Sequence, residues 1–206
     1  MWTWIDAAVD LVALNPHAAL GVVFLAAIIE AVAVLGIIVP GTPILMAVTG
    51  AAAMAGQPME PFLAVSIVGA VLGDFFSFWL GRRFSDRLHG VWPFAHWPMM
   101  MANAEWFFDR YGFYSVALCR FVPVLRSTVP LVAGMVGMRQ RRFVLANVVS
   151  AFVWAPLHIY PAQLAGLSLG RLREGDWQSG AIWGGILLAS CAGVWALHRA
   201  VSTRPR

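Results

Sequence analysis

The chain has 206 residues, of which 60% are hydrophobic and 12% are charged, and its mean hydropathy is +0.75. A soluble domain of this length carries about twice that charged fraction, so the composition indicates one integral membrane domain without an appended soluble domain. The net charge of +4 comes from arginine alone, because the chain contains no lysine. These arginines are scattered at the ends of apolar segments, which is typical of membrane orientation and argues against a nucleic-acid partner.

The first fifteen residues predict a short interfacial helix. They lack a basic region and contain Asp6 and Asp10, so they do not resemble a cleavable secretory signal. Trp2 and Trp4 would lie at the level of the lipid headgroups, where tryptophan is enriched.

Two long apolar stretches are interrupted by prolines. The first covers about residues 18–55, too long for one span of about 20 residues, and its middle contains Pro40, Gly41, Thr42 and Pro43. The other covers residues 112–138 and is expected to break at Pro123 and Pro130. We interpret both as re-entrant helical hairpins, related as inverted repeats, because paired interrupted segments often mark a binding site near the membrane midplane.

Uninterrupted apolar segments follow the hairpins, at residues 61–80, 143–169 and 181–197. A polar and aromatic linker covers residues 81–110 and ends in an amphipathic piece near residues 104–110. The predicted fold is therefore all-α and integral to the membrane. It combines two inverted re-entrant hairpins with about three full transmembrane helices, the last at residues 181–197, and amphipathic interfacial helices.

The distribution of arginine supports the hairpin interpretation. If both broken stretches return to the side that they entered from, ten loop and terminal arginines lie on one side and two on the other. By the positive-inside rule the richer side, with the C-terminus, is cytoplasmic. The ten are Arg82, Arg83, Arg87, Arg110, Arg139, Arg141, Arg142, Arg199, Arg204 and Arg206, and the two are Arg171 and Arg173.

Arg120 and Arg126 lie inside the second broken stretch and are the main candidates for substrate binding. Each guanidinium keeps its proton and costs about 2.5–3.5 kcal/mol at the centre of a membrane helix, so such residues are rarely without a role. A chain break between them would let both converge on a positively charged pocket for a lipid phosphate. The alternative is that each is a structural counter-ion, for Glu30 or for backbone carbonyls at the break.

Glu30 and Asp74 are the candidate coupling or gating acids. Glu30 lies about ten residues before Pro40, and either carries protons or forms a fixed ion pair. Asp74 follows the small-residue pair Gly69 and Gly73, whose spacing is typical of close helix packing. The breaks also leave backbone N–H groups free at the hairpin tips, where they would cradle an anion; the alternative is that the prolines and Gly41 serve only to turn the chain.

The sequence gives no reason to expect a metal or a cofactor. The five histidines and the two cysteines, Cys119 and Cys191, show no spacing typical of metal ligands, and both cysteines are expected to be packing residues. His158 is expected to be a satisfied membrane histidine.

Residues 20–170 resemble the DedA family, also called the VTT-domain or SNARE-associated family. The resemblance is carried by Glu30, Pro40-Gly41, Gly73-Asp74, Gly81-Arg82, residues 108–112, the block from Arg120 to Arg126, residues 130–135, and Phe143, Asn147 and Trp154. It implies a bacterial inner-membrane protein with two facing hairpins, in which Glu30, Arg120 and Arg126 are functionally important. Many members carry an acid where this chain has Thr42. The absence of that carboxylate implies either that transport is not coupled to an ion in this chain or that Glu30 or Asp74 takes over the coupling.

The family resemblance implies transport of a lipid carrier, notably undecaprenyl phosphate, across the inner membrane. We therefore expect a polyprenyl phosphate flippase, with a proton or sodium gradient as a candidate energy source and a membrane lipid as its partner. A general phospholipid scramblase is the first alternative. A membrane-bound lipid phosphatase is the second, although no histidine lies near the arginines in the sequence. We expect no enzymatic activity, and a homo-oligomer is compatible with the sequence.

Overall fold

The computed structural model describes residues 3–33, 35–85, 106–108, 110–120, 123–186 and 188–189. Every regular element within these ranges is a helix. Two of the described helices, α5 (Glu60–Arg83) and α10 (Gln140–Arg173), are long and apolar enough to cross a membrane. The predicted all-helical membrane fold is therefore confirmed.

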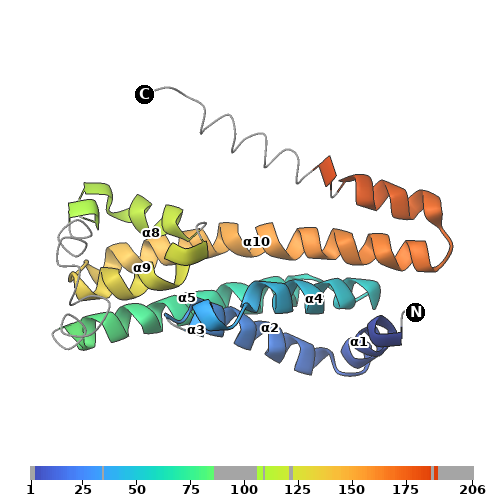
Figure 1. The fold of residues 1–206 in the computed structure, drawn as a ribbon, viewed down its shortest axis with the longest axis horizontal. Coiled ribbons are helices and arrows are strands. Elements are labelled where there is room, and N and C mark those ends of the chain that lie inside the picture. The colour runs from blue at the N-terminus through green and yellow to red at the C-terminus, as the bar shows by residue number, and fades with distance from the viewer. Residues whose placement is uncertain are drawn as a thin grey trace.

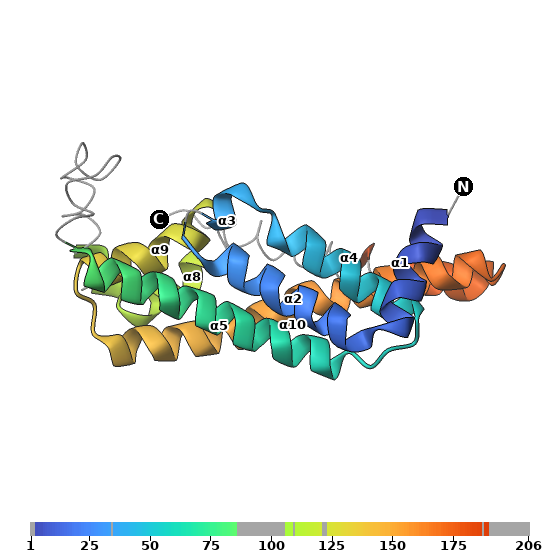
Figure 2. The ribbon, with the colours of Figure 1, turned by 90° about the horizontal axis from the view of Figure 1, so that it is seen from below.

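The first broken stretch forms a helical hairpin (Figure 2). Its arms are α2 (Pro16–Ala31) and α4 (Gly41–Met54), and the short α3 (Leu35–Ile38) lies at the tip. The second arm begins directly after Pro40, as the sequence predicted. Before it, α1 (Thr3–Leu14) meets α2 at a bend of 107°, so the N-terminal segment is a separate helix.

The second broken stretch also folds back on itself. Its arms are α8 (Phe113–Cys119) and α9 (Pro123–Met135), and its tip points toward α3 in the middle of the molecule (Figure 1). The two hairpins thus enter from opposite ends and meet near the centre. Their return within the bilayer stays a prediction.

The two long helices each join both hairpins. The α5 helix packs against α2 and α9, whereas α10 packs against α8 and α4. Each long helix therefore contacts the first arm of the hairpin that precedes it and the second arm of the other hairpin. This exchange of partners agrees with the inverted repeat expected from the sequence.

The second arms of both hairpins end in the same way. Gly56 follows α4 with φ +68°, and Gly137 follows α9 with φ +71°, a backbone region in which a Cβ atom is strained. The residue after each glycine donates its N–H to a carbonyl five residues back, Gln57 to Ala52 and Met138 to Ala133. These are Schellman caps, and each one turns the chain toward the following long helix.

The buried face of α5 consists mainly of small and polar side chains, with Phe62 and Phe78 as its large apolar members. Gly73 and Gly69 face α2 so closely that added Cβ atoms would lie 2.7 Å and 2.8 Å from the backbone oxygens of Ile28 and Phe24. This confirms the predicted close-packing role of the pair. Four other large residues of α5 are exposed, as a lipid-facing surface requires, namely Val68, Leu72, Phe76 and Trp79.

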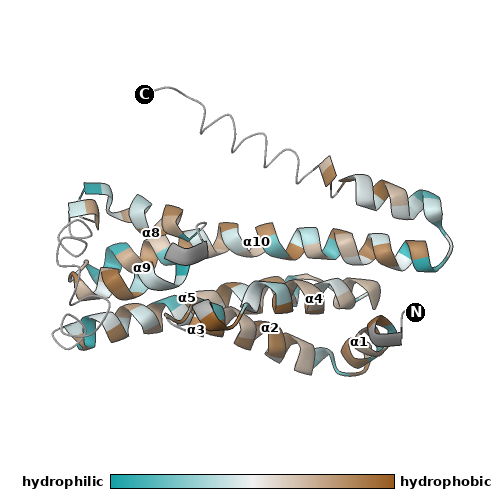
Figure 3. Ribbon diagram, viewed as in Figure 1, coloured by the Kyte–Doolittle hydropathy of each residue, from teal (hydrophilic) through white to brown (hydrophobic). Residues whose placement is uncertain are grey.

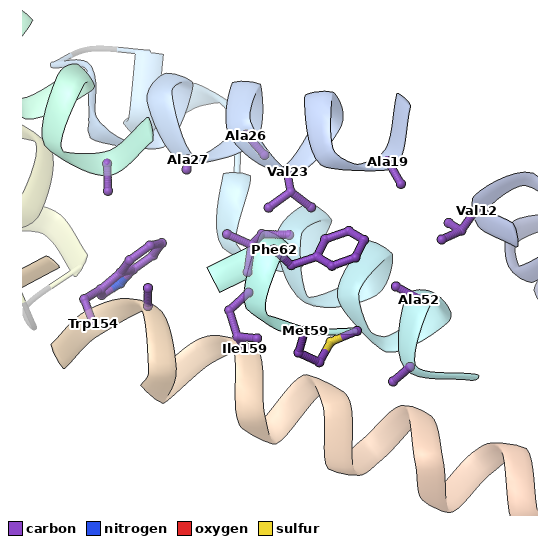
Figure 4. Close-up of a cluster of buried hydrophobic side chains, with 14 residues drawn as sticks. Val12, Ala19, Val23, Ala26, Ala27, Ala52, Met59, Phe62, Trp154 and Ile159 are labelled. Atoms are coloured by element: carbon purple, nitrogen blue, oxygen red, sulfur yellow. The ribbon is translucent and has the colours of Figure 1, made fainter. Parts of the chain in front are cut away.

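A hydrophobic core fills the space between the first hairpin and the long helices. Trp154 and Ile159 project from α10 toward Val23 and Ala27 of α2 (Figure 4). Trp154 is 1% exposed, so its indole is fixed in place by packing. A second cluster lies at the other end, where the rings of Phe78 and Phe143 stack with centroids 4.2 Å apart.

Hydrophilic residues occur at both ends of the bundle and at a few places between them, whereas hydrophobic residues occur throughout its helices (Figure 3). Four arginines, Arg82, Arg139, Arg141 and Arg142, line one cavity at the end where α5 stops and α10 begins. Arg173 instead pairs with Asp6 of α1, at the opposite end. The expected grouping of these residues is thus confirmed, whereas Arg87, Arg199, Arg204 and Arg206 lie outside the described residues.

Three expectations need a correction or a limit. Pro130 was expected to break the second stretch, but it lies inside α9, which continues to Met135. Pro43 lies in the first turn of α4, where a missing backbone donor costs no hydrogen bond. Residues 177–186 are helical, but more than half of the expected helix at residues 181–197 lies outside the described residues. Of the amphipathic piece at residues 104–110, the structure describes residues 106–108 and 110, which are helical.

Candidate functional site

The tips of the two hairpins bring four charged side chains together. Glu30 lies in the last turn of α2, Arg120 directly follows α8, and Arg126 lies in the first turn of α9. Asp74 comes from the middle of α5. The predicted convergence of the two arginines is therefore found, and the chain turns between α8 and α9 to produce it.

Arg120 is held on several sides by polar groups. Its Nη2 atom lies 2.9 Å from Asp74 Oδ2, and both side chains are almost completely buried. Its Nη1 atom donates to the carbonyl and to Oδ1 of Asn147, at 3.0 and 2.8 Å, and to Ser150 Oγ at 2.9 Å. Asn147 in turn donates to the carbonyl of Val71 in α5. The Arg120 guanidinium is thus a fixed link among α8, α5 and α10.

Arg126 has fewer polar contacts than Arg120. Its Nη1 atom lies 2.8 Å from Glu30 Oε1, and its guanidinium lies over the indole of Trp154, with Cζ 4.1 Å from the ring centroid. Its Nε and Nη2 atoms are buried and have no hydrogen-bond partner among the described residues. The Nε atom of Arg120 is unpartnered in the same way, but the Nη2 atom of Arg120 has Asp74 as its ion-pair partner. Two donors of the Arg126 guanidinium are therefore available to an anion.

Thr42 completes the Glu30 side of the cluster. Its hydroxyl donates a hydrogen bond of 2.5 Å to Glu30 Oε1, the same oxygen that pairs with Arg126. Gly41 makes the approach possible, because a Cβ atom there would lie 2.5 Å from the Ala26 carbonyl and 2.7 Å from Glu30 Cβ. The break at Pro40 and Gly41 thus positions Glu30.

The cluster is balanced in charge, and the expectation of a positively charged pocket is wrong. The two arginines are matched by Glu30 and Asp74, because an unpaired charge buried at this depth would cost several kcal/mol, on the order of 3–5. Both acids come from the first hairpin and its long helix, and both arginines from the second hairpin. Both ion pairs therefore cross the boundary between the two repeats.

His158 lies closer to the site than the sequence indicated. Its ring centroid is 4.6 Å from that of Trp154, which carries Arg126 on its indole, and its Nδ1 atom is 2.8 Å from the Trp154 carbonyl. The spacing of four residues on α10 could have revealed its contact with Trp154, but not the position of Arg126. Asn147 and Ser150 were likewise not predicted as partners of Arg120.

The VTT domain family matches residues 39–164, which is more than half of the chain and includes Thr42, Asp74 and both arginines. The chain belongs to the DedA family. It is 32% identical over 179 residues to inner membrane protein YabI of Escherichia coli, a match that covers 84% of this chain and 67% of YabI.

Two further DedA-family comparisons give the same result. The chain is 32% identical over 171 residues to the uncharacterized membrane protein Rv2637 of Mycobacterium tuberculosis, which covers 79% of this chain and 75% of the relative. It is 26% identical over 134 residues to Protein DedA of Escherichia coli, with 62% and 59% covered. The chain spans roughly three fifths to three quarters of these relatives' lengths, and no solved structure matches it.

The family membership supports a membrane-related role for this DedA protein and a location in a membrane. Among the residues that the structure describes, no group of three or more histidine, cysteine, aspartate or glutamate side chains could hold a metal ion.

Proposed function

We propose that this protein moves a phosphate-bearing lipid across the bacterial inner membrane, with undecaprenyl phosphate or another polyprenyl phosphate as the substrate. Membership of the DedA family supports a membrane-related role. The observation that carries the proposal is the pairing of Arg126. This buried guanidinium has one carboxylate partner and keeps two donors without a partner among the described residues.

In this proposal the lipid phosphate replaces Glu30 as the partner of Arg126. A phosphate can accept two parallel hydrogen bonds from a guanidinium, and the free Nε and Nη2 atoms of Arg126 form one edge of that fork. Trp154 holds the guanidinium plane from below while the partner changes. Arg120 remains in place and positions the second hairpin.

In this proposal the lipid headgroup crosses between the two hairpin tips, where both ion pairs lie. Because both pairs join the two repeats, exchanging Glu30 for phosphate loosens one of two polar links between the hairpins. A phosphate alone in hydrocarbon is prohibitively costly, but a paired and hydrogen-bonded one is not. The isoprenoid tail remains in the surrounding lipid while the headgroup passes between the hairpin tips.

We propose that Glu30 couples or gates transport, with Asp74 as the second candidate, and that a proton or sodium gradient drives it. We also propose that the end with Arg82 and Arg139–Arg142 faces the cytoplasm, together with the C-terminus. The positive-inside rule supports this orientation, because among the described residues these four arginines outnumber the two at the opposite end, Arg171 and Arg173.

We further propose that the lipid leaves chemically unchanged. A phosphatase would need a nucleophile aligned with a base. His158 Nδ1 instead contacts the carbonyl of Trp154, which leaves only the other ring nitrogen for such a role. Release of inorganic phosphate from polyprenyl phosphate by the purified protein would contradict this part of the proposal.

The test is a flip assay in liposomes that contain the purified protein. Fluorescent polyprenyl phosphate is compared with fluorescent phosphatidylcholine and phosphatidylglycerol, with and without a pH gradient. The proposal predicts faster movement of polyprenyl phosphate, lost in Arg126→Gln and retained in Arg171→Gln, an exposed arginine at the far end. Equal movement of all three lipids would indicate a general scramblase, and no movement would contradict transport.

A further inference from the structure

The arginine-rich end contains a cavity that the central cluster does not use. Arg82, Arg139, Arg141 and Arg142 line it, and its volume is about 1030 Å³. The arginines come from two elements, because Arg82 ends α5 and the other three surround the start of α10. All four are exposed, and within the described ranges none forms an ion pair with an acid.

The arginines at the start of α10 are in an electrostatically unfavourable position. The N-terminal end of a helix carries a partial positive charge that favours acids and disfavours bases. In α10 the N-cap residue is Arg139 and the first turn contains Arg141 and Arg142 without any acid. The N-cap side chain also makes no capping hydrogen bond. The local charge is therefore uncompensated, and an anion bound at this point would relieve it.

The cavity also has an apolar border. Val144 and Leu145 belong to its lining, and Leu145 is 61% exposed on the outer surface of α10. The basic lining is thus continuous with a lipid-facing helix. A soluble anion would use only the arginines, whereas a lipid would place its phosphate on the arginines and its first chain carbons on Leu145. Basic pockets of this kind at helix ends suit anionic headgroups.

We propose that this cavity is a second phosphate site, which binds the headgroup of an anionic membrane lipid at the surface of the bilayer. The site is separate from the cluster of Arg120 and Arg126 and does not require that the protein transports lipid. It is defined by Arg82 and by Arg139–Arg142, and its apolar side by Leu145.

The opposite end of the molecule offers a matched control. Arg171 and Arg173 are also arginines at the end of α10, but Arg171 pairs with Glu174 and Arg173 with Asp6. An equal loss of charge can therefore be introduced at either end of the same helix. Only the loss at the cavity should affect the binding of anionic lipid.

The experiment measures binding of dioctanoyl phosphatidylglycerol to the purified full chain in a neutral detergent. Dioctanoyl phosphatidylcholine and glycerol 3-phosphate serve as comparison ligands. Since each basic residue near a membrane surface contributes about 1 kcal/mol, the double variant Arg141→Gln/Arg142→Gln should bind phosphatidylglycerol about tenfold to thirtyfold more weakly. The double variant Arg171→Gln/Arg173→Gln should change binding less than about twofold if those paired arginines take no part.

The comparison ligands distinguish a lipid headgroup from a free phosphate. The salt titration uses the unmodified protein, so its result does not depend on the folding of a variant. Phosphatidylcholine and glycerol 3-phosphate should bind much more weakly than phosphatidylglycerol, because the first lacks net charge and the second lacks a tail. In the unmodified protein, phosphatidylglycerol binding should weaken as sodium chloride is raised. Equal loss in both double variants, salt-independent binding, or equally strong binding of glycerol 3-phosphate would each overturn the proposal of an anionic lipid site.

Discussion

Arg120 and Arg126 are six residues apart in one sequence block, yet their surroundings differ. Arg120 has Asp74, Asn147 and Ser150 around it, and this set joins three helices. Arg126 has a single carboxylate partner and lies 4.1 Å above an indole ring that Arg120 approaches only to 5.9 Å. Both arginines have an Nε atom without a hydrogen-bond partner among the described residues, but the Nη2 atom of Arg120 pairs with Asp74, whereas the Nη2 atom of Arg126 has no such partner. The comparison teaches that two arginines in one motif can divide their roles, one positioning the fold and the other exchanging partners.

The two acids show the same contrast. The Asp74 side chain is 6% exposed and lies in the middle of a long helix, whereas the Glu30 side chain is 13% exposed and lies at a hairpin tip. Glu30 also accepts a hydrogen bond from Thr42, which would keep it placed when Arg126 releases it. A carboxylate at a tip can leave its partner at lower cost than one inside a packed helix.

The largest expected effect is on stability. Arg120→Gln leaves Asp74 as an unpaired buried charge and should lower the free energy of unfolding by about 3–5 kcal/mol. Arg126→Gln should cost less than half of that, because Glu30 is nearer the surface and keeps Thr42. Unfolding of both purified variants in detergent, followed by circular dichroism, measures the difference. Equal losses would contradict the division of roles.

The next effect is on transport. Arg126→Gln removes a charge-assisted hydrogen bond to phosphate, worth about 1.5–3 kcal/mol, so flipping of polyprenyl phosphate should fall about tenfold to a hundredfold. Arg126→Lys should restore little, because an ammonium lacks the planar fork. Initial rates in liposomes give the comparison, with Arg171→Gln as the control. A fully active and stable Arg126→Gln protein would contradict the claim that Arg126 binds the lipid phosphate.

A smaller effect is expected from replacing Trp154, whose indole ring lies against the Arg126 guanidinium. Trp154→Leu removes a cation–π contact worth about 0.5–2 kcal/mol and should reduce polyprenyl phosphate affinity by about twofold to thirtyfold. Phe62→Leu is the matched control, because Phe62 is a buried aromatic of the same core, whereas the cation–π contacts of both arginines are with Trp154. Both variants should lose stability through a cavity, but only Trp154→Leu should lose affinity. Equal losses of affinity would reduce Trp154 to a packing residue.

Much of the fold was accessible from the sequence because its strongest constraints are local. Pro40 and Gly41 break a run that is too long for one span, and the uninterrupted run at residues 61–80 became the centre of α5. Pro130 misled the prediction, because a proline can remain within a helix when neighbouring groups satisfy the freed carbonyl. Local sequence does not reveal those neighbours.

The candidate site was predicted only in part, for a similar reason. Intramembrane charge identified Arg120, Arg126, Glu30 and Asp74, since each is too costly to be there without a partner. The pairing of the acids with the arginines depends on how the two hairpins meet, which is a property of the tertiary structure. The support of Arg120 by Asn147 and the place of Arg126 on Trp154 depend on α10, far along the chain.

The central claim is that Glu30 and a lipid phosphate compete for Arg126. The most direct measurement is the affinity of the purified protein for polyprenyl phosphate in Glu30→Gln, with Glu60→Gln, an exposed acid at the start of α5, as the control. Competition predicts that Glu30→Gln binds the lipid more tightly than the unmodified protein, while Glu60→Gln is unchanged. Weaker or equal binding by a folded Glu30→Gln protein would contradict the claim and leave Glu30 as a structural counter-ion.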